Sequence, residues 1–421
     1  MPTERALLVT VQLDPRFEPG KARWSIQDEA AELRELASGA GCRVIGEVLA
    51  KRHRPVAGTF LGQGKLEEIA GEAQDNQAQT VVFNQELSSA QQRNIEDVLR
   101  VKTIDRTQLI LDIFAQRARS QEGKVQVELA QLRYLLPRLV GKGIMLSRLG
   151  GGIGTRGPGE QKLEMDRRRI RARITRLGDE LEKLGRRREA TRLRRKETEV
   201  PVAALVGYTN AGKTTLLNRL TGAGAPVRNQ LFTTLDPLAR RAKLPSGEAI
   251  VVTDTVGFLH HLPHHLIEAF HATLEEARDA DVLLHVVDAS HPQLGERIAA
   301  VEDVLSELKL QDKPRITVLN KRDQAPDPVR WQALERGYEP AAAISAKTGE
   351  GLQELGRLID AELSELLVAP TQLRIPVEQA EVLAAVYRAG QVLRRQEADG
   401  VIELSVRLPA KLKTRLSDYV A

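Results

Sequence analysis

The chain has 421 residues and is too long for one compact core. Hydrophobic residues make up 42% and charged residues 28%, which is an ordinary globular composition. Aromatic residues make up only 3%, which argues against a single-stranded nucleic-acid binder built on base stacking. One cysteine, Cys42, excludes an intramolecular disulfide and a thiolate metal site, and no apolar run approaches the ~18 residues of a membrane span. We therefore expect a soluble, cytoplasmic protein of several domains. Separately, we expect it to be a monomer.

The net charge of +5 is concentrated in one segment. Residues 166–197 contain 14 Lys or Arg and 6 Asp or Glu, a local charge of +8, so the other residues sum to −3. A concentrated basic stripe is typical of a protein that binds a polyanion.

Strand and helix patterns alternate over residues 1–106. The expected strands are Leu7–Val11, Arg43–Val48, Val81–Asn84 and Val101–Ile104. The expected helices are Ile26–Ala37, Leu66–Asn76 and Ser89–Leu99. This alternation predicts a small parallel α/β domain. The segment Gly62-Gln-Gly64-Lys65 lacks the Ser or Thr of a phosphate loop after its lysine, so we interpret it as a turn into a helix.

Residues 107–197 predict a helical hairpin. A helix follows Asp105 and continues toward Val140, with a break near Gly123. Eight of the nineteen residues in 141–159 are glycine and none is acidic, which predicts a loop at the tip of the hairpin. The second helix, from residue 160 to 197, has a coiled-coil seam of apolar residues three and four apart: Ile170, Ile174, Leu177, Leu181 and Leu184.

A second α/β domain, residues 198–368, contains a phosphate-loop motif. Residues 207–214 read Gly-Tyr-Thr-Asn-Ala-Gly-Lys-Thr and follow the apolar strand Val202–Val206. Glycine-rich backbone wraps a β-phosphate, Lys213 reaches the β and γ oxygens, and Thr214 can ligate Mg²⁺. Asn210 either coordinates a monovalent cation such as K⁺ or makes a hydrogen bond within the loop.

Three further motifs each follow an expected strand. Asp254-Thr-Val-Gly257 supplies a carboxylate for Mg²⁺ and an amide for the γ-phosphate. In Asn320-Lys321-Arg322-Asp323, the Asp323 carboxylate can accept the N1–H and N2 amino hydrogens of guanine, which adenine lacks. Ser345-Ala346-Lys347 can present a backbone amide to guanine O6. The four motifs together indicate a P-loop GTPase domain that binds GTP and GDP and hydrolyses GTP.

The motifs define the candidate site residues. Those expected to bind GTP are Gly207, Tyr208, Thr209, Asn210, Ala211, Gly212, Lys213, Thr214, Thr215, Asp254, Thr255, Val256, Gly257, Asn320, Lys321, Asp323, Ser345, Ala346 and Lys347. A first switch is expected at residues 231–237, where one of two threonines would contact Mg²⁺ and the γ-phosphate. The alternative is that neither threonine is a ligand.

The residue after Gly257 is Phe258, where many GTPases have a glutamine that orients the attacking water. Phenylalanine has no donor or acceptor, so we expect slow intrinsic hydrolysis. The stretch His260-His261-Leu-Pro-His264-His265 admits a metal site, but its position after the second switch favours polar switch residues.

Residues 369–421 predict a small C-terminal α+β domain. Strands are expected at Leu373–Val377, Val392–Arg395 and Ile402–Val406, and helices near Gln379–Ala389 and Ala410–Tyr419.

The chain resembles the HflX family of ribosome-associated GTPases. The most specific match is the run of residues 150–170, which begins Gly-Gly-Gly-Ile-Gly-Thr-Arg-Gly-Pro-Gly-Glu160 and ends Asp166-Arg-Arg-Arg-Ile170. Residues 231–237, 254–258 and 104–118 fit the family as well. The resemblance favours Thr234 over Thr233 as the switch ligand. It implies Lys213, Thr234 and Gly257 as catalytic residues, and Thr214, Thr234 and Asp254 at Mg²⁺.

The resemblance also implies a partner. The N-terminal domain and hairpin would dock on the large ribosomal subunit and its ribosomal RNA, and the protein would split or rescue ribosomes. Phe258 fits the family's hydrophobic substitution at the glutamine position. Two other interpretations stay open: a GTPase of ribosome assembly or RNA modification, and an RNA-binding protein in which GTP is only structural.

Overall fold

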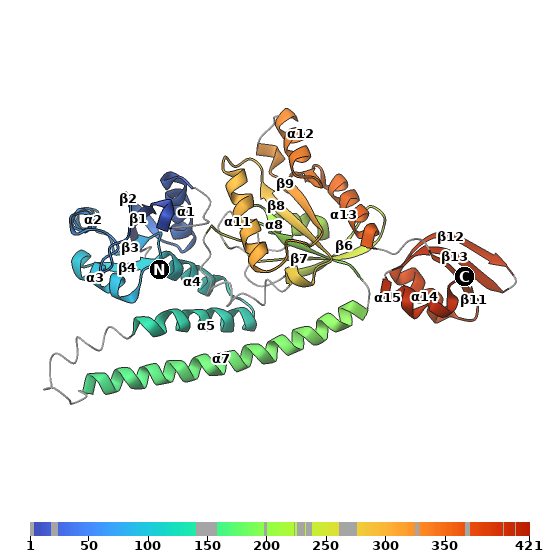
Figure 1. The fold of residues 1–421 in the computed structure, drawn as a ribbon, viewed down its shortest axis with the longest axis horizontal. Helices are drawn as coiled ribbons and strands as arrows, with labels where there is room; N and C mark the ends of the chain where they lie inside the picture. Colours follow the sequence, from blue (N-terminus) through green and yellow to red (C-terminus); the bar gives the residue numbers. More distant parts are fainter. Residues whose placement is uncertain are drawn as a thin grey trace.

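The computed structural model describes residues 4–17, 24–139, 158–197, 200–222, 224, 232, 238–260, 276–324, 328–366, 371–398, 400–408 and 410–421. Along the horizontal axis of Figure 1, a small α/β unit is followed by a larger one and then by a small C-terminal unit. A long helix runs beside the first two. Among the described residues, no helix is long and apolar enough to cross a membrane.

The N-terminal unit is a four-stranded parallel sheet with strand order β2-β1-β3-β4. Its strands are β1 (Arg5–Leu13), β2 (Arg43–Arg52), β3 (Thr80–Phe83) and β4 (Lys102–Asp105). Its helices are α1 (Ile26–Gly39), α2 (Gln63–Asp75), α3 (Ser89–Leu99) and α4 (Arg106–Arg117). Serines start two of them, because Ser25 and Ser88 each form a capping box with the residue three positions later. The predicted parallel α/β domain is confirmed.

The hairpin helices are α5 (Gln121–Arg138) and α7 (Pro158–Glu197), which lie side by side (Figure 1). Leu177 of α7 is fully buried against Val125 and Leu129 of α5, and Ile174 and Leu181 pack on the same cluster, so the middle of the predicted seam packs. The break before α5 lies at residues 118–120, because the Ser120 side chain accepts a hydrogen bond from the amide of Gly123 and starts a new helix. Because α7 starts at Pro158, the last two residues of the predicted loop are helical.

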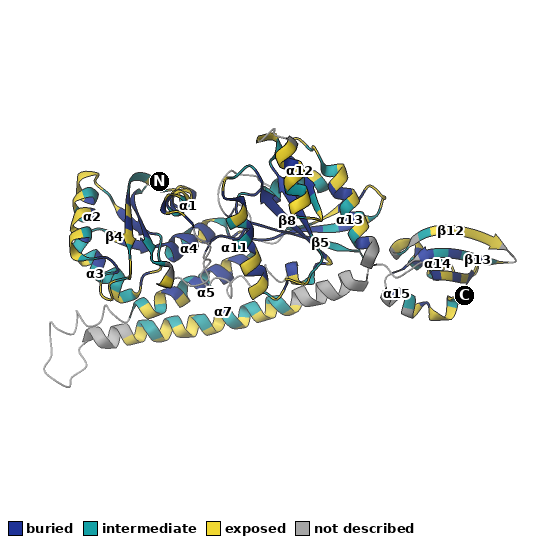
Figure 2. Ribbon diagram, turned by 45° about the horizontal axis from the view of Figure 1, so that its top comes forward, coloured by how far each residue is buried: buried dark blue, intermediate teal, exposed yellow. Residues whose placement is uncertain are grey.

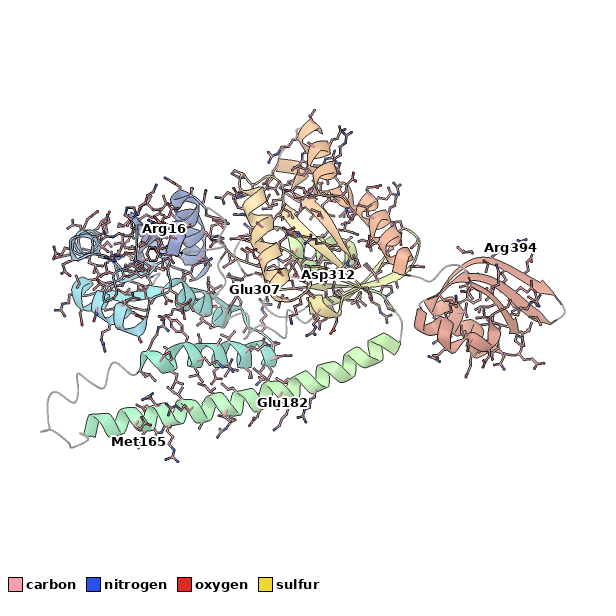
Figure 3. The ribbon with its side chains drawn as sticks, in the orientation of Figure 1. Arg16, Met165, Glu182, Glu307, Asp312 and Arg394 are labelled. Carbon is pink, nitrogen blue, oxygen red and sulfur yellow. The ribbon has the colours of Figure 1, made fainter. Side chains whose placement is uncertain are left out.

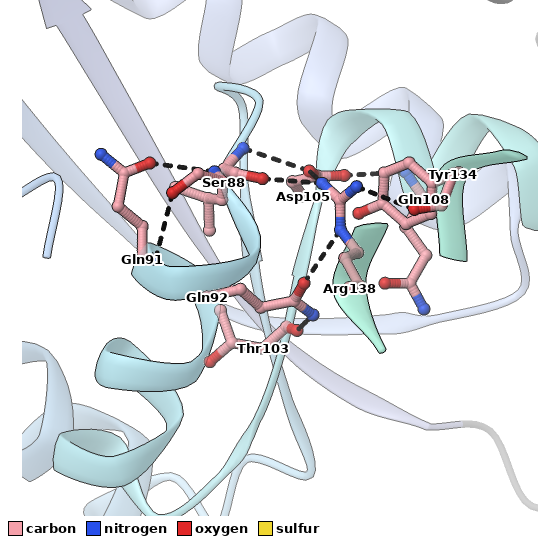
Figure 4. Close-up of polar contacts among 9 residues, drawn as sticks. Ser88, Gln91, Gln92, Thr103, Asp105, Gln108, Tyr134 and Arg138 are labelled. Atoms are coloured by element: carbon pink, nitrogen blue, oxygen red, sulfur yellow. Dashed lines mark hydrogen bonds and ion pairs between the residues drawn. The ribbon is translucent and has the colours of Figure 1, made fainter. Parts of the chain in front are cut away.

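A buried ion pair fixes α5 to the N-terminal sheet (Figure 4). The Arg138 guanidinium donates to Asp105 at 3.1 Å and to the carbonyl of Leu87 at 2.7 Å. Asp105 also accepts from the amides of Leu87 and Gln108, at 3.1 and 2.8 Å. The Arg138 guanidinium lies over the ring of Tyr134, 3.4 Å from its centroid. Each partner is satisfied by several hydrogen bonds, as a buried ion pair requires.

The central unit is a six-stranded sheet with strand order β10-β9-β8-β5-β7-β6. The strands are β5 (Val202–Val206), β6 (Leu238–Lys243), β7 (Ala249–Asp254), β8 (Val282–Asp288), β9 (Arg315–Asn320) and β10 (Ala341–Ala343). Among the described strands of this sheet, only the edge strand β6 is antiparallel to its neighbour. The helices are α8 (Lys213–Thr221), α11 (Leu294–Glu307), α12 (Pro328–Gly337) and α13 (Leu352–Leu366). In Figure 2 the strands at the centre of this sheet are buried.

The C-terminal unit is a three-stranded antiparallel sheet with strand order β11-β13-β12. Its strands are β11 (Thr371–Pro376), β12 (Gln391–Ala398) and β13 (Val401–Arg407), and its helices are α14 (Ala380–Ala389) and α15 (Ala410–Arg415). Side-chain burial alternates along β11: Leu373 and Ile375 are fully buried in the core, and Gln372 and Arg374 are exposed. The expected strands and helices of this unit are present.

Candidate nucleotide site

The phosphate loop joins the buried strand β5 to the N-terminus of α8. Gly207 has φ +147°, and a Cβ there would lie 2.2 Å from the carbonyl oxygen of Val286. Gly212 has φ +98°, and a Cβ there would lie 2.3 Å from Nδ2 of Asn320. Only glycine fits either position, so the two glycines of the motif are required by close packing as well as by conformation.

The side chains expected at the phosphates and Mg²⁺ converge at this loop. The Lys213 ammonium is buried and donates to the carbonyls of Gly207 and Tyr208, each at 2.9 Å. The Thr214 hydroxyl donates to Asp254 at 2.8 Å. A hydroxyl beside a carboxylate is a donor set that Mg²⁺ accepts, so these residues fit the ion. When bound, Mg²⁺ would neutralise charge on the β and γ oxygens.

Burial lowers the pKa of two basic side chains near the loop. Desolvation lowers the pKa of Lys213 to about 8, although the nearby Asp254 carboxylate opposes this change. Burial also lowers the pKa of His285, on β8, to about 3, and the charges of Arg315 and Lys213 act in the same direction. His285 is therefore neutral at physiological pH, and the positive charge expected at the phosphates belongs to Lys213.

The guanine-side motifs are linked to the phosphate loop by Asn320. Its side-chain amide donates to the carbonyl of Ala211 at 2.7 Å, and its side-chain oxygen accepts from the amide of Ala346 at 2.9 Å. One buried side chain thus bridges the phosphate loop and the Ser345-Ala346-Lys347 motif. Both motifs lie at the carboxyl ends of parallel strands, where α/β sheets bind ligands.

Asp323 and Ser345 lie side by side. The Ser345 hydroxyl donates to Asp323 at 2.7 Å and accepts from the amide of Thr348 at 3.1 Å. Lys321 forms an ion pair with Asp288 at 2.7 Å. Sequence reasoning missed Asp288, although its position directly after an apolar run that ends at Val287 could have indicated it.

The second switch pairs with the phosphate loop. The amide of Thr209 donates to the carbonyl of Phe258 at 2.8 Å, and the amide of Phe258 donates to the carbonyl of Gly207 at 3.1 Å. A Cβ at Gly257 would lie 2.7 Å from the Thr209 side chain and 3.1 Å from the Lys213 ammonium. Phe258 is 1% exposed, so its ring is packed in the interior.

The first switch is described only at Phe232, whose side chain is 2% exposed. Thr233 and Thr234 lie outside the described residues, and so do His261, His264 and His265. His260 is described and buried, and its ring stacks on Trp24 of the N-terminal unit. Among the residues that the structure describes, no cluster of three or more His, Cys, Asp or Glu side chains could hold a metal.

Family models match the chain along most of its length. The matches are "GTP-binding GTPase N-terminal" over residues 27–115, "GTP-binding GTPase Middle Region" over 117–195, "50S ribosome-binding GTPase" over 202–321 and "HflX C-terminal domain" over 333–418. The GTPase HflX of Caldanaerobacter subterraneus subsp. tengcongensis is 46% identical over 417 residues, covering 99% of this chain and 94% of the relative. The chain belongs to the HflX family of GTPases.

Two further relatives agree with this assignment. The GTPase HflX of Lacrimispora saccharolytica is 47% identical, covering 99% of this chain and 96% of its own. That of Escherichia coli K12 is 43% identical, covering 93% and 94%. Among solved structures, a GTP-binding protein from Sulfolobus solfataricus in complex with GDP is 26% identical, with a TM-score of 0.44 over 86% of this chain and 100% of its own. The HflX family members are GTPases, and so is this chain.

Proposed function

We propose that this GTPase binds the large ribosomal subunit in its GTP form and splits or rescues ribosomes. The observation that carries the proposal is the basic face of α7. Arg168 and Arg176 are exposed on it, and neither makes an ion pair within the described part of the chain. Such arginines are available to RNA phosphates.

The proposed RNA-binding helix is connected to the rest of the molecule. In Figure 3, α7 presents side chains such as Met165 and Glu182 along its length, and Met165 is 54% exposed. On the other side, α7 packs on α5, and Arg138 of α5 is bonded into the N-terminal sheet. We assign residues 1–106 and 107–197 as the ribosome-facing units, residues 198–368 as the GTPase domain and residues 369–421 as a C-terminal domain.

The nucleotide part of the proposal rests on the four motifs at the carboxyl-end edge of the central sheet. We propose that Lys213 stabilises the β- and γ-phosphates, that Thr214, Thr234 and Asp254 bind Mg²⁺, and that the Gly257 amide meets the γ-phosphate. Asn210 would either bind K⁺ or make a hydrogen bond within the loop. Because Phe258 supplies no group for the attacking water, a ribosome would have to order the switches or supply that group.

Neutralising the two arginines tests the ribosome-binding proposal. Arg168→Gln and Arg176→Gln, singly and together, should weaken co-sedimentation with isolated large subunits in a non-hydrolysable GTP analogue. The slope of log affinity against log salt should become shallower by about one for each arginine that binds a phosphate in the parent chain. The matched control is Arg336→Gln, which removes an exposed arginine from α12. Unchanged affinity and slope in the double variant would contradict the role of α7.

A second measurement separates ribosome splitting from the alternative role in ribosome assembly. Purified chain in the GTP-analogue form is mixed with intact ribosomes and run on a sucrose gradient. Appearance of free subunits that depends on Arg168 and Arg176 supports splitting. Binding to precursor particles with no effect on intact ribosomes would favour the assembly or RNA-modification interpretation instead.

A further inference from the structure

The phosphate-loop residue Tyr208 directs its side chain into the N-terminal unit. It is 4% exposed and belongs to a hydrophobic cluster that includes Trp24 of the N-terminal unit and Phe258 of the second switch. The guanidinium of Arg297, from α11, lies over its ring, 4.8 Å from the centroid. The backbone of residue 208 therefore serves the nucleotide loop, and its side chain serves a domain interface.

The Tyr208 hydroxyl connects two other parts of the chain. It donates to the carboxylate of Glu32, on α1, and accepts from the backbone amide of His260 at 2.9 Å. The other Glu32 oxygen accepts from Arg106, at the start of α4. Burial raises the pKa of Tyr208 well above its ordinary value, and the charge of Glu32 raises it further. The hydroxyl therefore keeps its proton and remains a donor to Glu32.

An aromatic stack reinforces this connection. The ring of Trp24 stacks on that of His260, with centroids 4.4 Å apart and planes 18° apart. The same Trp24 ring lies 6.0 Å from the ring of Tyr208, at 29°. His260 is three residues after Gly257, whose amide is expected to meet the γ-phosphate. A shift of the second switch toward the phosphate would therefore act on contacts made by Trp24 and Tyr208.

The first switch also contacts the N-terminal unit. Phe232 packs edge-on against Phe114 of α4, with centroids 4.5 Å apart and planes 71° apart. Phe232 has φ 56°, a left-handed conformation that is uncommon for a bulky residue and needs support from its surroundings.

We propose that Trp24 and Glu32 are positioning residues for the second switch, and that they couple the N-terminal domain to the nucleotide state through Tyr208 and His260. Neither residue touches the reacting atoms. Trp24 stacks on His260 directly, whereas Glu32 acts through Tyr208, whose hydroxyl accepts from the His260 amide. A conformation that moves His260 must therefore alter the stack and the hydrogen bond to Tyr208. Coupling is reciprocal: if the nucleotide changes how the N-terminal domain is held, a partner on that domain changes nucleotide affinity.

The first test removes one hydroxyl. Tyr208→Phe in the full chain should change the ratio of affinities for a non-hydrolysable GTP analogue and GDP by about tenfold, the ratio that a hydrogen bond to a charged group is worth. Glu32→Gln retains an acceptor without the charge and should give a smaller change. The matched control is Tyr134→Phe, because Tyr134 is also 4% exposed but lies on α5, where Arg138 covers its ring. A purely structural role would move both affinities equally and leave the ratio unchanged, which would overturn the proposal.

The second test measures tryptophan fluorescence, which reports on the stack between Trp24 and His260. The chain has two tryptophans, so Trp331→Phe leaves Trp24 as the only reporter. Its emission should differ between the GDP and GTP-analogue forms, because the ring stacked on it belongs to the second switch. Tyr208→Phe should change that difference. Subtracting the signal of Trp24→Phe from that of the parent gives the same information if Trp331→Phe does not fold. Identical Trp24 emission in both nucleotides would overturn the coupling.

Discussion

The two faces of the phosphate loop are built in different ways. On the nucleotide face, the contacts use backbone groups and short motifs, such as the Lys213 ammonium on the carbonyl of Gly207. On the opposite face, the contacts are between side chains far apart in the sequence, such as Tyr208 with Glu32. Each motif on the first face is contiguous, whereas the second face exists only when two domains pack together.

Because of this difference, one face of the loop binds the nucleotide and the other contacts the N-terminal unit and the second switch. The nucleotide face offers glycine-lined backbone and one ammonium, which suit any nucleoside triphosphate. The domain face offers one ring and one hydroxyl, whose partners on α1 and in the second switch depend on domain placement. Changes on the first face should therefore alter nucleotide affinity itself, and changes on the second should alter preference between nucleotide states.

The largest effect is expected from a change at the guanine end of the nucleotide site. Asp323→Asn removes the carboxylate expected to accept both guanine donors, and should weaken GTP binding by roughly 10²-fold or more. Xanthosine triphosphate carries a carbonyl where guanine has its amino group. The variant should therefore bind xanthosine triphosphate more tightly than the parent chain binds it. Equilibrium titration with labelled nucleotides measures both affinities.

Asp312→Asn is the control for this change. Asp312 is exposed in the turn before β9 (Figure 3). Asp323 follows the other end of that strand. The control should bind GTP as the parent does. Equal GTP affinity in Asp323→Asn and Asp312→Asn would remove Asp323 from the guanine site.

An intermediate effect is expected from pH. The pKa of Lys213 is about 8 without nucleotide, and phosphate charges would raise it, so binding favours the protonated form. Affinity should be flat below about pH 8 and fall by up to about tenfold per pH unit above it. Calorimetry in buffers of different ionisation enthalpy should show proton uptake near pH 8. In Lys213→Arg the side chain stays protonated over this range, so the fall in affinity above pH 8 should disappear. A variant with the same pH profile as the parent would contradict the assignment of this titration to Lys213.

The smallest effect is expected on the domain face. Phe114→Leu loses the edge-on pair with Phe232, which is worth about 0.5–1.5 kcal/mol beyond area burial. Hydrogen exchange in the peptide that contains Phe232 should accelerate by about tenfold at most. Phe83→Leu is the control, because Phe83 is equally buried in a different cluster of the N-terminal unit. Equal acceleration in the two variants would show that the aromatic pair contributes nothing specific.

Much of the fold could be predicted because its signals are local. Strand β5 was predicted with its exact bounds, since an apolar run between a proline and the phosphate loop leaves little freedom. The seam of α7 was predicted because Ile174, Leu177 and Leu181 recur at helical spacing, and all three pack toward α5. The break before α5 was misplaced by a few residues, because Gly123 suggested an interruption whereas the cap is made by Ser120.

The candidate site could be predicted only in part, because some of its contacts join segments that are far apart in the sequence. Asn320 was expected at the guanine, but its bridge between Ala211 and Ala346 depends on three strand ends that meet at one edge of the sheet. His260 was expected to be a polar switch residue, and the structure buries it under Trp24. No sequence spacing relates residues 24 and 260.

Short contiguous motifs were enough to define the chemistry of the nucleotide face. Glycines, Lys213 and the strand-end carboxylates act through local backbone geometry, which a short motif specifies completely. The role of the other face depends on domain packing, because whether Tyr208 is exposed or bonded to Glu32 depends on a domain that folds from a separate stretch of sequence. Burial, hydrogen-bond partners and the pKa of Lys213 all depend on such packing, so none of them could be obtained from the motif alone.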